Sequence, residues 1–455
     1  MKKIGFDFPK EPRKTALWEA EQWYQKKLAE LLDREYEPIK ISNFGQYHMA
    51  VNYITSVLEE SLAINKVAVF NIDHMAQIEF SGNDAETLLD RVLPTNVANM
   101  KIGQCKYTLL LTEKGTVLDD LIIMKVTEDR FILVINAGHD ITDEEHGMIA
   151  DADFINSFKK ENEDVAIADI SDKLVKIDVQ GPLSYKLLAS LYGEEVLKNR
   201  NKPSKNMKFF TFNEFSYEGY DYMLSRTGYT NRWGWEMYVP VEVAEDQFKR
   251  IAEKALELGG LVVGLGGRDE NRISAGNFGL PLNGSEYDRE HTPVNAPLFN
   301  AAVDMSKDFF VGKEALQKEI DAGVDKRMAL FITEGIVTGR EIYKDDKKIG
   351  VVTSSINSPN VSQEKREYIG SKRKSVNGET GTCAIGLGWF THNPFEVDEN
   401  GNDILADEKG PVRIKVEFYK TKNGERKGKP ILGYISGDGV NPATAPRPLK
   451  NIQNL

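Results

Sequence analysis

Two adjacent carboxylates, Asp119 and Asp120, are the first residues of this chain whose types and positions indicate chemistry. They precede an apolar strand predicted at residues 121–124, which follows another apolar strand at 107–111 and a turn at Gly115. Because neighbouring residues on a strand point to opposite faces, we expect one aspartate to point inward. A carboxylate beside an apolar strand loses hydration unless it meets a donor, so this aspartate is a candidate site residue. The alternative is that both carboxylates cap the turn in water.

A second group of candidate residues follows between positions 226 and 269. The glycines at 264–267 precede Arg268, and glycines followed by an arginine at a helix start can cradle a phosphate or a carboxylate. The chain has neither a GxGxxG fingerprint nor a Walker lysine. From the residues alone, Glu236 can equally be an acid on a strand face and Arg268 a surface residue. Trp233 and Trp235 either belong to the core or wall a substrate pocket.

The composition excludes several classes of protein. The 455 residues carry a formal net charge of −12, which argues against a nucleic-acid surface, and we interpret the basic run at 365–374 as a solvated loop. Cys105 and Cys383 form neither a metal-binding pattern nor a disulfide framework, so we expect a reducing compartment and no metal site. No apolar run has the length of a signal-peptide core or a membrane-spanning helix. We therefore expect a soluble, cytoplasmic protein with no nucleic-acid or membrane partner.

The elements that must position these residues alternate between helices and strands, which is typical of α+β layers. Apolar spacing predicts helices at residues 15–32, 49–62, 84–92, 184–192, 243–258 and 265–275. Ser81 is the expected N-cap of the helix at 84–92. The same analysis predicts strands at 67–70, 76–80, 130–136, 173–179, 209–212, 221–225 and 237–239. From residue 327 onward, short strands separated by turns indicate a small β-barrel or sandwich, interrupted by a polar surface insertion at 357–382.

Seven motifs resemble, in order, those of the glycine-cleavage T-protein family, the tetrahydrofolate-dependent aminomethyltransferases. The motifs are NIDHM (71–75), GTVLDDLI (115–122), INA (135–137), VQGP (179–182), RTGYTNRWGWE (226–236), GLGGRD (264–269) and DFFVGKEAL (308–316). Relatives within this superfamily include folate-dependent demethylases. The resemblance implies an α+β fold with three domains in a ring around a central folate channel, and a C-terminal β-barrel. The expected domains are an N-terminal helical extension (1–45), a folate-binding region of two α+β subdomains (46–322) and the barrel (323–455), with its insertion near 357–382.

The resemblance also implies roles for single residues. The family's catalytic aspartate corresponds to Asp120, and its folate-binding residues correspond to Tyr107, Asn136, Tyr229, Glu236 and Arg268. A carboxylate such as Glu236 can accept both donors of the pterin's amino-pyrimidine edge. Tyrosine faces can pack against the flat ring, and an arginine fork can orient a carboxylate-bearing cofactor. Asp120 near folate N5 and N10 can stabilise developing positive charge or steer a proton.

The chain departs from the family pattern at several positions. Thr-Asn-Arg replaces the family's Thr-Gly-Glu at 230–232, Ser274 replaces a glutamate, and Asn295 replaces another. We expect these changes to touch the mouth of the channel and the outer surface rather than the acids at the pterin edge. These changes weaken the specific expectation that the one-carbon donor is an aminomethyl group held by a lipoyl carrier protein.

Three functions are therefore considered. The first is transfer of a one-carbon unit from an amine-type donor to tetrahydrofolate, with a lipoyl carrier protein as partner in the closest case. The second is a tetrahydrofolate-dependent demethylase that takes a methyl group from an N-, O- or S-methyl compound. The third is a non-catalytic folate-binding protein, which the intact pair Asp119–Asp120 argues against. Both enzymes need tetrahydrofolate and a small-molecule one-carbon donor.

Overall fold

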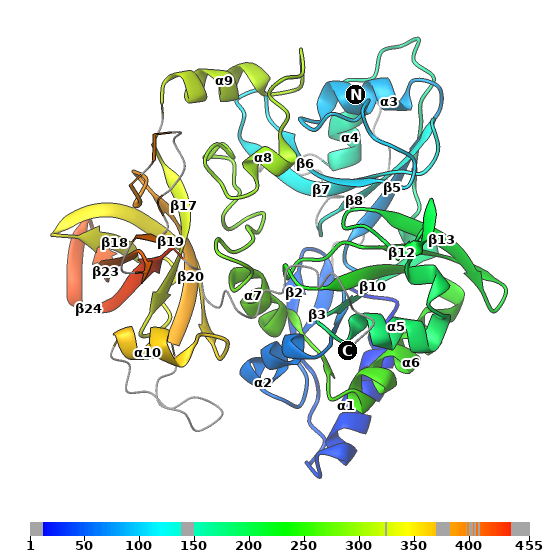
Figure 1. Cartoon of the computed structure of the whole chain (residues 1–455), viewed down its shortest axis with the longest axis horizontal. Coiled ribbons are helices and arrows are strands. Elements are labelled where there is room, and N and C mark those ends of the chain that lie inside the picture. Colours follow the sequence, from blue (N-terminus) through cyan, green and yellow to red (C-terminus); the bar gives the residue numbers. More distant parts are fainter. Residues whose placement is uncertain are drawn as a thin grey trace.

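The structure is a computed structural model that describes residues 12–137, 150–323, 325–369, 383–396, 398–399, 404, 406–407 and 410–437. The described chain forms three lobes arranged in a ring (Figure 1). The segment between α7 (Leu265–Ile273) and α8 (Phe299–Ala302) runs between the lobes. This arrangement confirms the predicted α+β ring.

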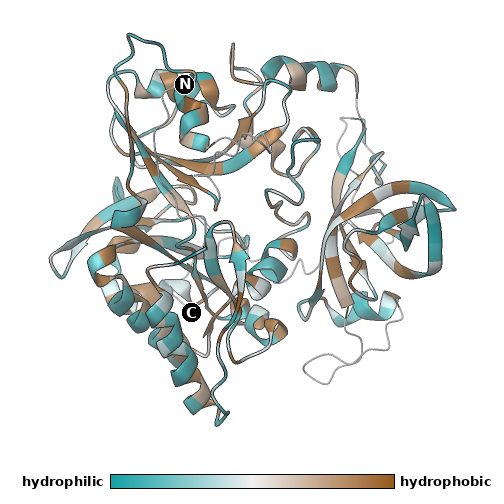
Figure 2. Ribbon diagram, turned by 180° about the vertical axis from the view of Figure 1, so that it is seen from behind, coloured by the Kyte–Doolittle hydropathy of each residue, from teal (hydrophilic) through white to brown (hydrophobic). Residues whose placement is uncertain are grey.

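The first lobe is built on a six-stranded sheet in the order β13-β14-β15-β10-β4-β16. Its strands are β13 (Phe212–Tyr217), β14 (Tyr220–Ser225), β15 (Gly234–Pro240), β10 (Leu174–Gln180), β4 (Ala68–Asn71) and β16 (Leu261–Val262). Helices α1 (Trp18–Leu31), α5 (Ser184–Tyr192) and α6 (Ala244–Glu257) cover one face, because their apolar sides share a core with Val69, Ile177 and Trp235. Figure 2 shows hydrophilic residues on the outer sides of these helices and hydrophobic residues along the strands.

The second lobe is built on a five-stranded sheet in the order β6-β7-β8-β5-β9. Its strands are β6 (Cys105–Leu111), β7 (Val117–Lys125), β8 (Arg130–Ile135), β5 (Ala76–Ser81) and β9 (Ala166–Asp169). Helices α3 (Ala85–Val92) and α4 (Asp151–Asn156) pack on one face through a core that includes Leu88, Ile123 and Leu133. The hairpin of β6 and β7 confirms the strand–turn–strand prediction around the two aspartates.

The other faces of these two sheets confront each other. One buried cluster joins side chains from both sheets, namely Cys105, Met124, Val126, Ile132, Val134, Ile170, Phe212, Met223 and Tyr238. Because side chains alternate along a strand, residues two or four positions from these members lie on the same confronting faces. Polar residues on these faces are therefore brought close to the space between the lobes.

The third lobe is a closed barrel of six strands in the order β17-β20-β19-β18-β23-β24, as predicted for the C-terminal part. Its strands are β17 (Arg327–Thr333), β20 (Cys383–Phe390), β19 (Lys347–Ser358), β18 (Glu341–Lys344), β23 (Arg413–Lys422) and β24 (Glu425–Ser436). Helix α9 (Lys313–Asp321) precedes the barrel. Of the predicted insertion, residues 357–358 belong to β19 and 363–369 form helix α10 (Gln363–Ile369), while 370–382 lie outside the described residues. We keep the domain limits at 45 and 322 as a proposal, although helix α1 of the N-terminal extension packs in the core of the first lobe.

The helix predicted at 49–62 is wrong in its first half. Strand β3 (Tyr47–Asn52) pairs with β2 (Lys40–Phe44) and with β1 (Arg13–Lys14), and helix α2 (Val57–Leu62) begins only after Ser56. The helix starts there because Ser56 Oγ accepts a hydrogen bond from the amide of Glu59 at 3.2 Å, while the Glu59 carboxylate accepts one from the amide of Ser56 at 2.8 Å. This reciprocal capping box satisfies two backbone donors that the helix itself leaves free.

Other sequence predictions need smaller corrections. Ser81 ends β5, and α3 begins after Asp84, which makes no side-chain cap, so Ser81 is not its N-cap. The strand predicted at 209–212 begins only at Phe212. The basic run is not simply a solvated loop, because Lys365 and Arg366 are 2% and 5% exposed and the Arg366 guanidinium donates to backbone carbonyls, while 370–374 lie outside the described residues.

The remaining described elements are short. They are η1 (Ala63–Asn65), η2 (Ser171–Lys173), η3 (Glu195–Leu197), η4 (Val241–Val243), β11 (Lys198–Asn199), β12 (Lys202–Asn206), β21 (Ala406–Asp407) and β22 (Gly410–Pro411). Among the helices that the structure describes, none is both long and apolar enough to cross a membrane.

Candidate active site

The aspartate pair lies on β7, where the strand pairs with β6. Leu110 and Leu109 of β6 are the cross-strand partners of Asp119 and Asp120, and a register shift follows at Leu111. Asp119 is only 4% exposed and Asp120 is half-buried. The alternative that both carboxylates cap the turn in water is therefore wrong.

Two of the residues predicted from the sequence, Tyr107 and Asn136, meet at this pair, together with Asn283, which was not predicted. The Tyr107 hydroxyl donates to Asp120 Oδ2 at 3.1 Å. The Asn136 amide nitrogen donates to Oδ1 of Asp119 and to Oδ1 of Asp120, both at 2.9 Å, and to the Asp120 carbonyl at 2.8 Å. Asn283, from the segment between α7 and α8, donates to Asp119 Oδ1 at 2.6 Å. Asp119 is thus held by two amides, while Asp120 also receives the tyrosine hydroxyl.

Burial makes Asp120 a weaker acid than an ordinary aspartate. Loss of solvent, followed by the nearby charge of Asp119, raises the pKa of Asp120 to about 7, although the hydrogen bonds from Tyr107 and Asn136 oppose the shift. Burial and the charge of Asp119 also raise the pKa of Asp151, at the start of α4, well above its usual range. A carboxyl group with a pKa near 7 can exchange a proton or carry charge at neutral pH, which is typical of catalytic acids and bases.

Glu236 lies on β15 of the other sheet and is 6% exposed. Its Oε2 accepts a hydrogen bond from the Thr227 hydroxyl at 2.6 Å and lies 3.4 Å from the ammonium nitrogen of Lys176, which is fully buried. Asp178 of β10 is the direct cross-strand partner of Glu236. The Gln180 amide nitrogen donates to Asp178 Oδ1 at 2.7 Å. The side chains of Glu236, Asp178 and Lys176 are therefore buried together on one face of this sheet.

The same burial shifts the acidity of the groups around Glu236. Loss of solvent, followed by the charge of Glu236, raises the pKa of Asp178 to about 8, while the positive charges of Arg268 and Lys176 act against this rise. Burial lowers the pKa of Lys176, and its neighbouring acids partly offset the effect. Around neutral pH, Asp178 accordingly holds its proton.

The two acidic positions lie on the faces by which the sheets confront each other. Asp120, Ile122 and Met124 lie at every second position of β7 and therefore share one face of the sheet. Glu236 and Tyr238 share one face of β15 for the same reason. Met124 and Tyr238 belong to the buried cluster that joins the sheets, and Ile122 packs against it. Asp120 and Glu236 therefore point from separate sheets toward the same side of the ring.

Tyr229 and Arg268 lie next to each other, with the guanidinium carbon 5.0 Å from the centre of the tyrosine ring. The Tyr229 hydroxyl donates to the carbonyl of Pro281. They line a cavity of about 400 Å³ with Ser42, Phe44, Val51, Leu265, Gly266, Asp269, Arg272, Leu282, Ser285, Thr338, Thr353, Ser354 and Ser355. Neither Asp120 nor Glu236 lines this cavity. The charge of Asp120 contributes to raising the pKa of Tyr229, although burial is the main cause, and the positive charge of Arg268 opposes the raised pKa of Asp178.

Sequence reasoning missed several residues of this region. Lys176, Asp178 and Gln180 form one polar stripe on an otherwise apolar strand, and this alternation was a readable signal. Asn283 and Tyr287 lie in the irregular segment between α7 and α8, where no site residue was predicted from the sequence. Tyr287 is 1% exposed, and burial, followed by the charge of Asp120, raises its pKa. No local pattern in the sequence could have linked that segment to Asp119.

The two aromatic candidates Trp233 and Trp235, and also His74 of the motif NIDHM, have structural surroundings. Trp235 is fully buried in the core under α5 and α6, and Trp233 packs against the Arg226 guanidinium at 4.0 Å. His74 is 1% exposed, contacts the ring of Phe44 at 5.0 Å, and burial lowers its pKa well below the usual range. In the ranges that the structure describes, no group of three or more histidine, cysteine, aspartate or glutamate side chains is arranged to hold a metal ion.

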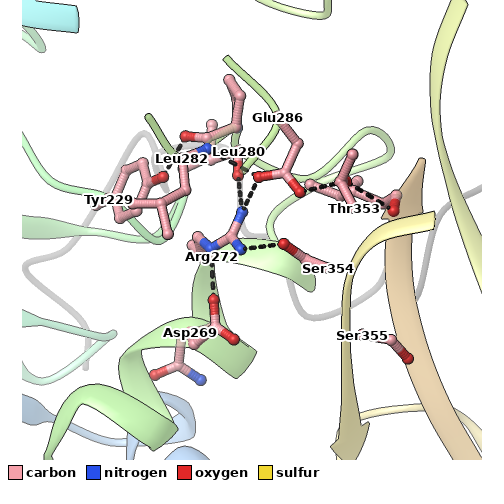
Figure 3. A network of polar contacts seen from close by, with 12 residues as sticks. Tyr229, Asp269, Arg272, Leu280, Leu282, Glu286, Thr353, Ser354 and Ser355 are labelled. Carbon is pink, nitrogen blue, oxygen red and sulfur yellow. Dashed lines mark hydrogen bonds and ion pairs between the residues drawn. The ribbon is translucent and has the colours of Figure 1, made fainter. Parts of the chain in front are cut away.

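A buried arginine joins the lobes next to Tyr229 (Figure 3). The Arg272 guanidinium of α7 donates to Asp269 Oδ1 at 2.6 Å, to the Leu280 carbonyl at 2.9 Å, to Glu286 Oε2 at 2.8 Å and to Ser354 Oγ of β19 at 2.9 Å. Arg272 is 2% exposed and Glu286 is fully buried. One side chain thus ties α7, the segment between the lobes and the barrel.

Replacing Arg272 by methionine is expected to lower the free energy of unfolding by about 3–5 kcal/mol, because it leaves Glu286 buried without its cation. Denaturant titration followed by tryptophan fluorescence measures this change. The control is Arg250→Met, which breaks the more exposed pair with Glu218 and should cost about 1 kcal/mol or less. Equal losses in the two variants would show that the buried pair is not a structural joint.

Comparisons with known proteins single out one family. A family model described as "GCVT N-terminal domain" matches residues 16–307, which is more than half of the chain. The chain is 33% identical over 325 residues to the aminomethyltransferase of Halalkalibacterium halodurans, covering 70% of this chain and 83% of that protein. It is 31% identical over 389 residues to the aminomethyltransferase of Natranaerobius thermophilus, covering 84% of this chain and 92% of that protein. The crystal structure of glycine cleavage system aminomethyltransferase T from Bartonella henselae matches with a TM-score of 0.66 at 24% identity, over 93% of this chain and 96% of that one, which supports the fold.

Proposed function

Because the chain belongs to the glycine-cleavage T-protein family, we propose that it transfers a one-carbon unit from an amine-type donor to tetrahydrofolate. The observation that carries this proposal is the placement of Asp120, with Tyr107 and Asn136, on one sheet and of Glu236 on the confronting sheet. The protein is thus an enzyme of the one-carbon transferase class, and its site has to hold a flat, nitrogen-rich ring together with a reacting amine.

The buried groups fit a reduced pterin. The pterin's amino-pyrimidine edge offers two adjacent donors, which the Glu236 carboxylate can accept. The faces of Tyr107 and Tyr229 can pack against the ring or the aminobenzoyl group. Arg268 stands beside Tyr229 at the wall of the cavity, where its charge suits the carboxylates of a glutamyl tail. We therefore propose Tyr107, Asn136, Tyr229, Glu236 and Arg268 as the folate-binding residues.

Asp120 is the proposed catalytic residue. When bound, tetrahydrofolate supplies the N5 and N10 amines that accept the one-carbon unit. Tyr107 and Asn136 orient the Asp120 carboxyl group, so it meets the reacting amine without reorganising. As a carboxylate, Asp120 stabilises positive charge that develops on this amine. Asn283 and Asn136 hold the neighbouring Asp119 away from solvent, which places a second negative charge beside the first.

Partners are part of the same proposal. The amine-type donor is a small molecule or, as in the glycine-cleavage reaction, an aminomethyl group carried on the lipoyl arm of a carrier protein. The changed residues Asn231 and Arg232 lie in the loop that precedes β15, where Asn231 is exposed and Arg232 is 8% exposed. The expected position on the outer surface therefore holds for Asn231, whereas Arg232 is buried.

The product of the reaction tests the proposal. The protein is incubated with tetrahydrofolate and a panel of amine donors, aryl methyl ethers, sulfonium compounds and an aminomethylated lipoyl carrier, and the folate product is identified by mass. We expect 5,10-methylene-tetrahydrofolate from an amine donor and none from the Asp120→Ala variant. Formation of 5-methyl-tetrahydrofolate would identify a demethylase instead, and binding without any product would contradict an enzymatic role.

A further inference from the structure

We propose that Asp178 is a second recognition residue for the pterin edge, donating a hydrogen bond to the 4-oxo oxygen while Glu236 accepts from the 2-amino group and N3–H. This inference rests on the proposed function and deepens it. It concerns which hydrogen-bonding edge of the nitrogen heterocycle the site recognises. It also assigns a role to a side chain that the motifs of the family resemblance do not include.

The geometry of the two strands supports this assignment. Asp178 and Glu236 are direct cross-strand partners of β10 and β15, so their side chains leave the same face about 4.5–5.5 Å apart at Cβ. That face is the one that confronts the five-stranded sheet, because Lys176 and Tyr238 form the next pair along it and Tyr238 belongs to the buried cluster between the sheets. Two carboxyl groups are therefore presented side by side.

One oxygen of Asp178 is left to serve a ligand. Asp178 is fully buried, and its Oδ1 already accepts from the Gln180 amide. Its Oδ2 has no hydrogen-bond partner among the described residues. A buried polar atom without a partner destabilises the fold unless something else satisfies it. In Glu236, by contrast, Oε2 is held by Thr227 and Lys176, which fixes that group as an acceptor.

The charges around Asp178 determine whether its carboxyl group is protonated. The groups that act on it are Glu236 of β15, Lys176 of β10 and Arg268 of α7. Two neighbouring buried carboxyl groups disfavour double ionisation, and burial with the charge of Glu236 raises the pKa of Asp178 to about 8. With its proton on Oδ2, Asp178 is a donor next to the two acceptor oxygens of Glu236.

This pattern is complementary to one particular ring edge. A 4-oxo pterin presents donor, donor and acceptor at the 2-amino group, N3 and O4, whereas a 2,4-diamino ring presents donor, acceptor and donor at the 2-amino group, N3 and the 4-amino group. The pair Glu236–Asp178 offers acceptor, acceptor and donor in the same order. Ionisation of Asp178 would replace its donor by a further acceptor, so affinity for the 4-oxo ring should fall as the pH rises through about 8.

The test is calorimetric titration of the full chain with tetrahydrofolate and with its 2,4-diamino analogue, between pH 6.5 and 9.5. We expect Asp178→Ala to weaken tetrahydrofolate binding roughly 10- to 100-fold at pH 7 and to reduce the preference for the 4-oxo ring, because only the contact of Glu236 with N3–H then distinguishes the two rings. We expect Asp178→Asn, whose amide can donate to O4 and accept from Gln180, to stay within about threefold of the wild type. Its affinity should also lose the decline above pH 8.

The outcomes separate this inference from the proposed function. If the wild type does not bind tetrahydrofolate, the proposed function fails. If the wild type binds and Asp178→Ala binds equally well, Asp178 is only a structural partner of Gln180 and the inference is overturned. If Asp178→Ala does not fold, the pH profile of Asp178→Asn decides, because a residue with a purely structural role would leave the decline above pH 8 in place.

Discussion

Replacing Asp120 by asparagine is expected to reduce turnover roughly 100- to 10,000-fold, while the affinity for tetrahydrofolate changes little. Asparagine keeps the size of the side chain and can still accept from Tyr107, so the pocket retains its shape. What it lacks is the negative charge that stabilises the reacting amine. Steady-state kinetics with the identified donor, together with calorimetric binding of tetrahydrofolate, measures the two quantities separately.

The pH profile of the wild type gives this prediction a second readout. Because Asp120 carries a proton below its pKa of about 7, and because the carboxylate is the form that stabilises positive charge, kcat/KM should rise with pH and reach half its maximum near pH 7. The rise should vanish in Asp120→Asn. Asp129→Asn, which alters an exposed acid of the same lobe, is the control and should behave as the wild type. Wild-type rates in both Asp120→Asn and Asp120→Ala would refute the catalytic assignment.

Replacing Glu236 by glutamine is expected to weaken tetrahydrofolate binding roughly 10- to 100-fold. The substitution exchanges one acceptor oxygen for an amide donor, which then opposes a donor of the pterin edge. It also removes the charge that faces the buried ammonium of Lys176 at 3.4 Å. Calorimetric titration at pH 7 measures the loss directly.

A matched control distinguishes this effect from a general change in the sheet. Glu214 lies on β13 of the same six-stranded sheet and is exposed, so Glu214→Gln should bind tetrahydrofolate as the wild type does. Because the amide of glutamine is nearly isosteric with the carboxylate, the unfolding transition of Glu236→Gln should remain cooperative. Unchanged affinity in Glu236→Gln would remove the residue from the binding site.

Local patterns were sufficient to predict the hairpin and many single elements. The turn at Gly115 between two apolar runs predicted β6 and β7, and the apolar spacing at 184–192 predicted α5 with its observed bounds. The short strands after residue 327 predicted a barrel, which the structure closes with six strands. The prediction failed at 49–62, where the apolar residues suit both a strand and a helix and the capping box at Ser56 decides where the helix begins.

The site was only partly predictable, because its geometry depends on contacts between distant segments. Motif order identified Asp120, Tyr107 and Asn136, which the structure brings together by hydrogen bonds. Asn283 reaches Asp119 across a separation of 164 residues in sequence, and no local pattern could reveal such a contact. The ion pair between Arg272 and Glu286 was likewise not predictable, since Arg272 lies on α7 and Glu286 lies in the irregular segment that follows it.

A crystal structure of the protein with bound 5-formyl-tetrahydrofolate tests the central claim most directly. We expect the ring between the confronting sheets, with its amino-pyrimidine edge on Glu236 and Asp178 and its N5–N10 region beside Asp120. The claim would be contradicted if the folate contacted neither Asp120 nor Glu236, for example by occupying the cavity of about 780 Å³ on the barrel between Tyr343 and Tyr434.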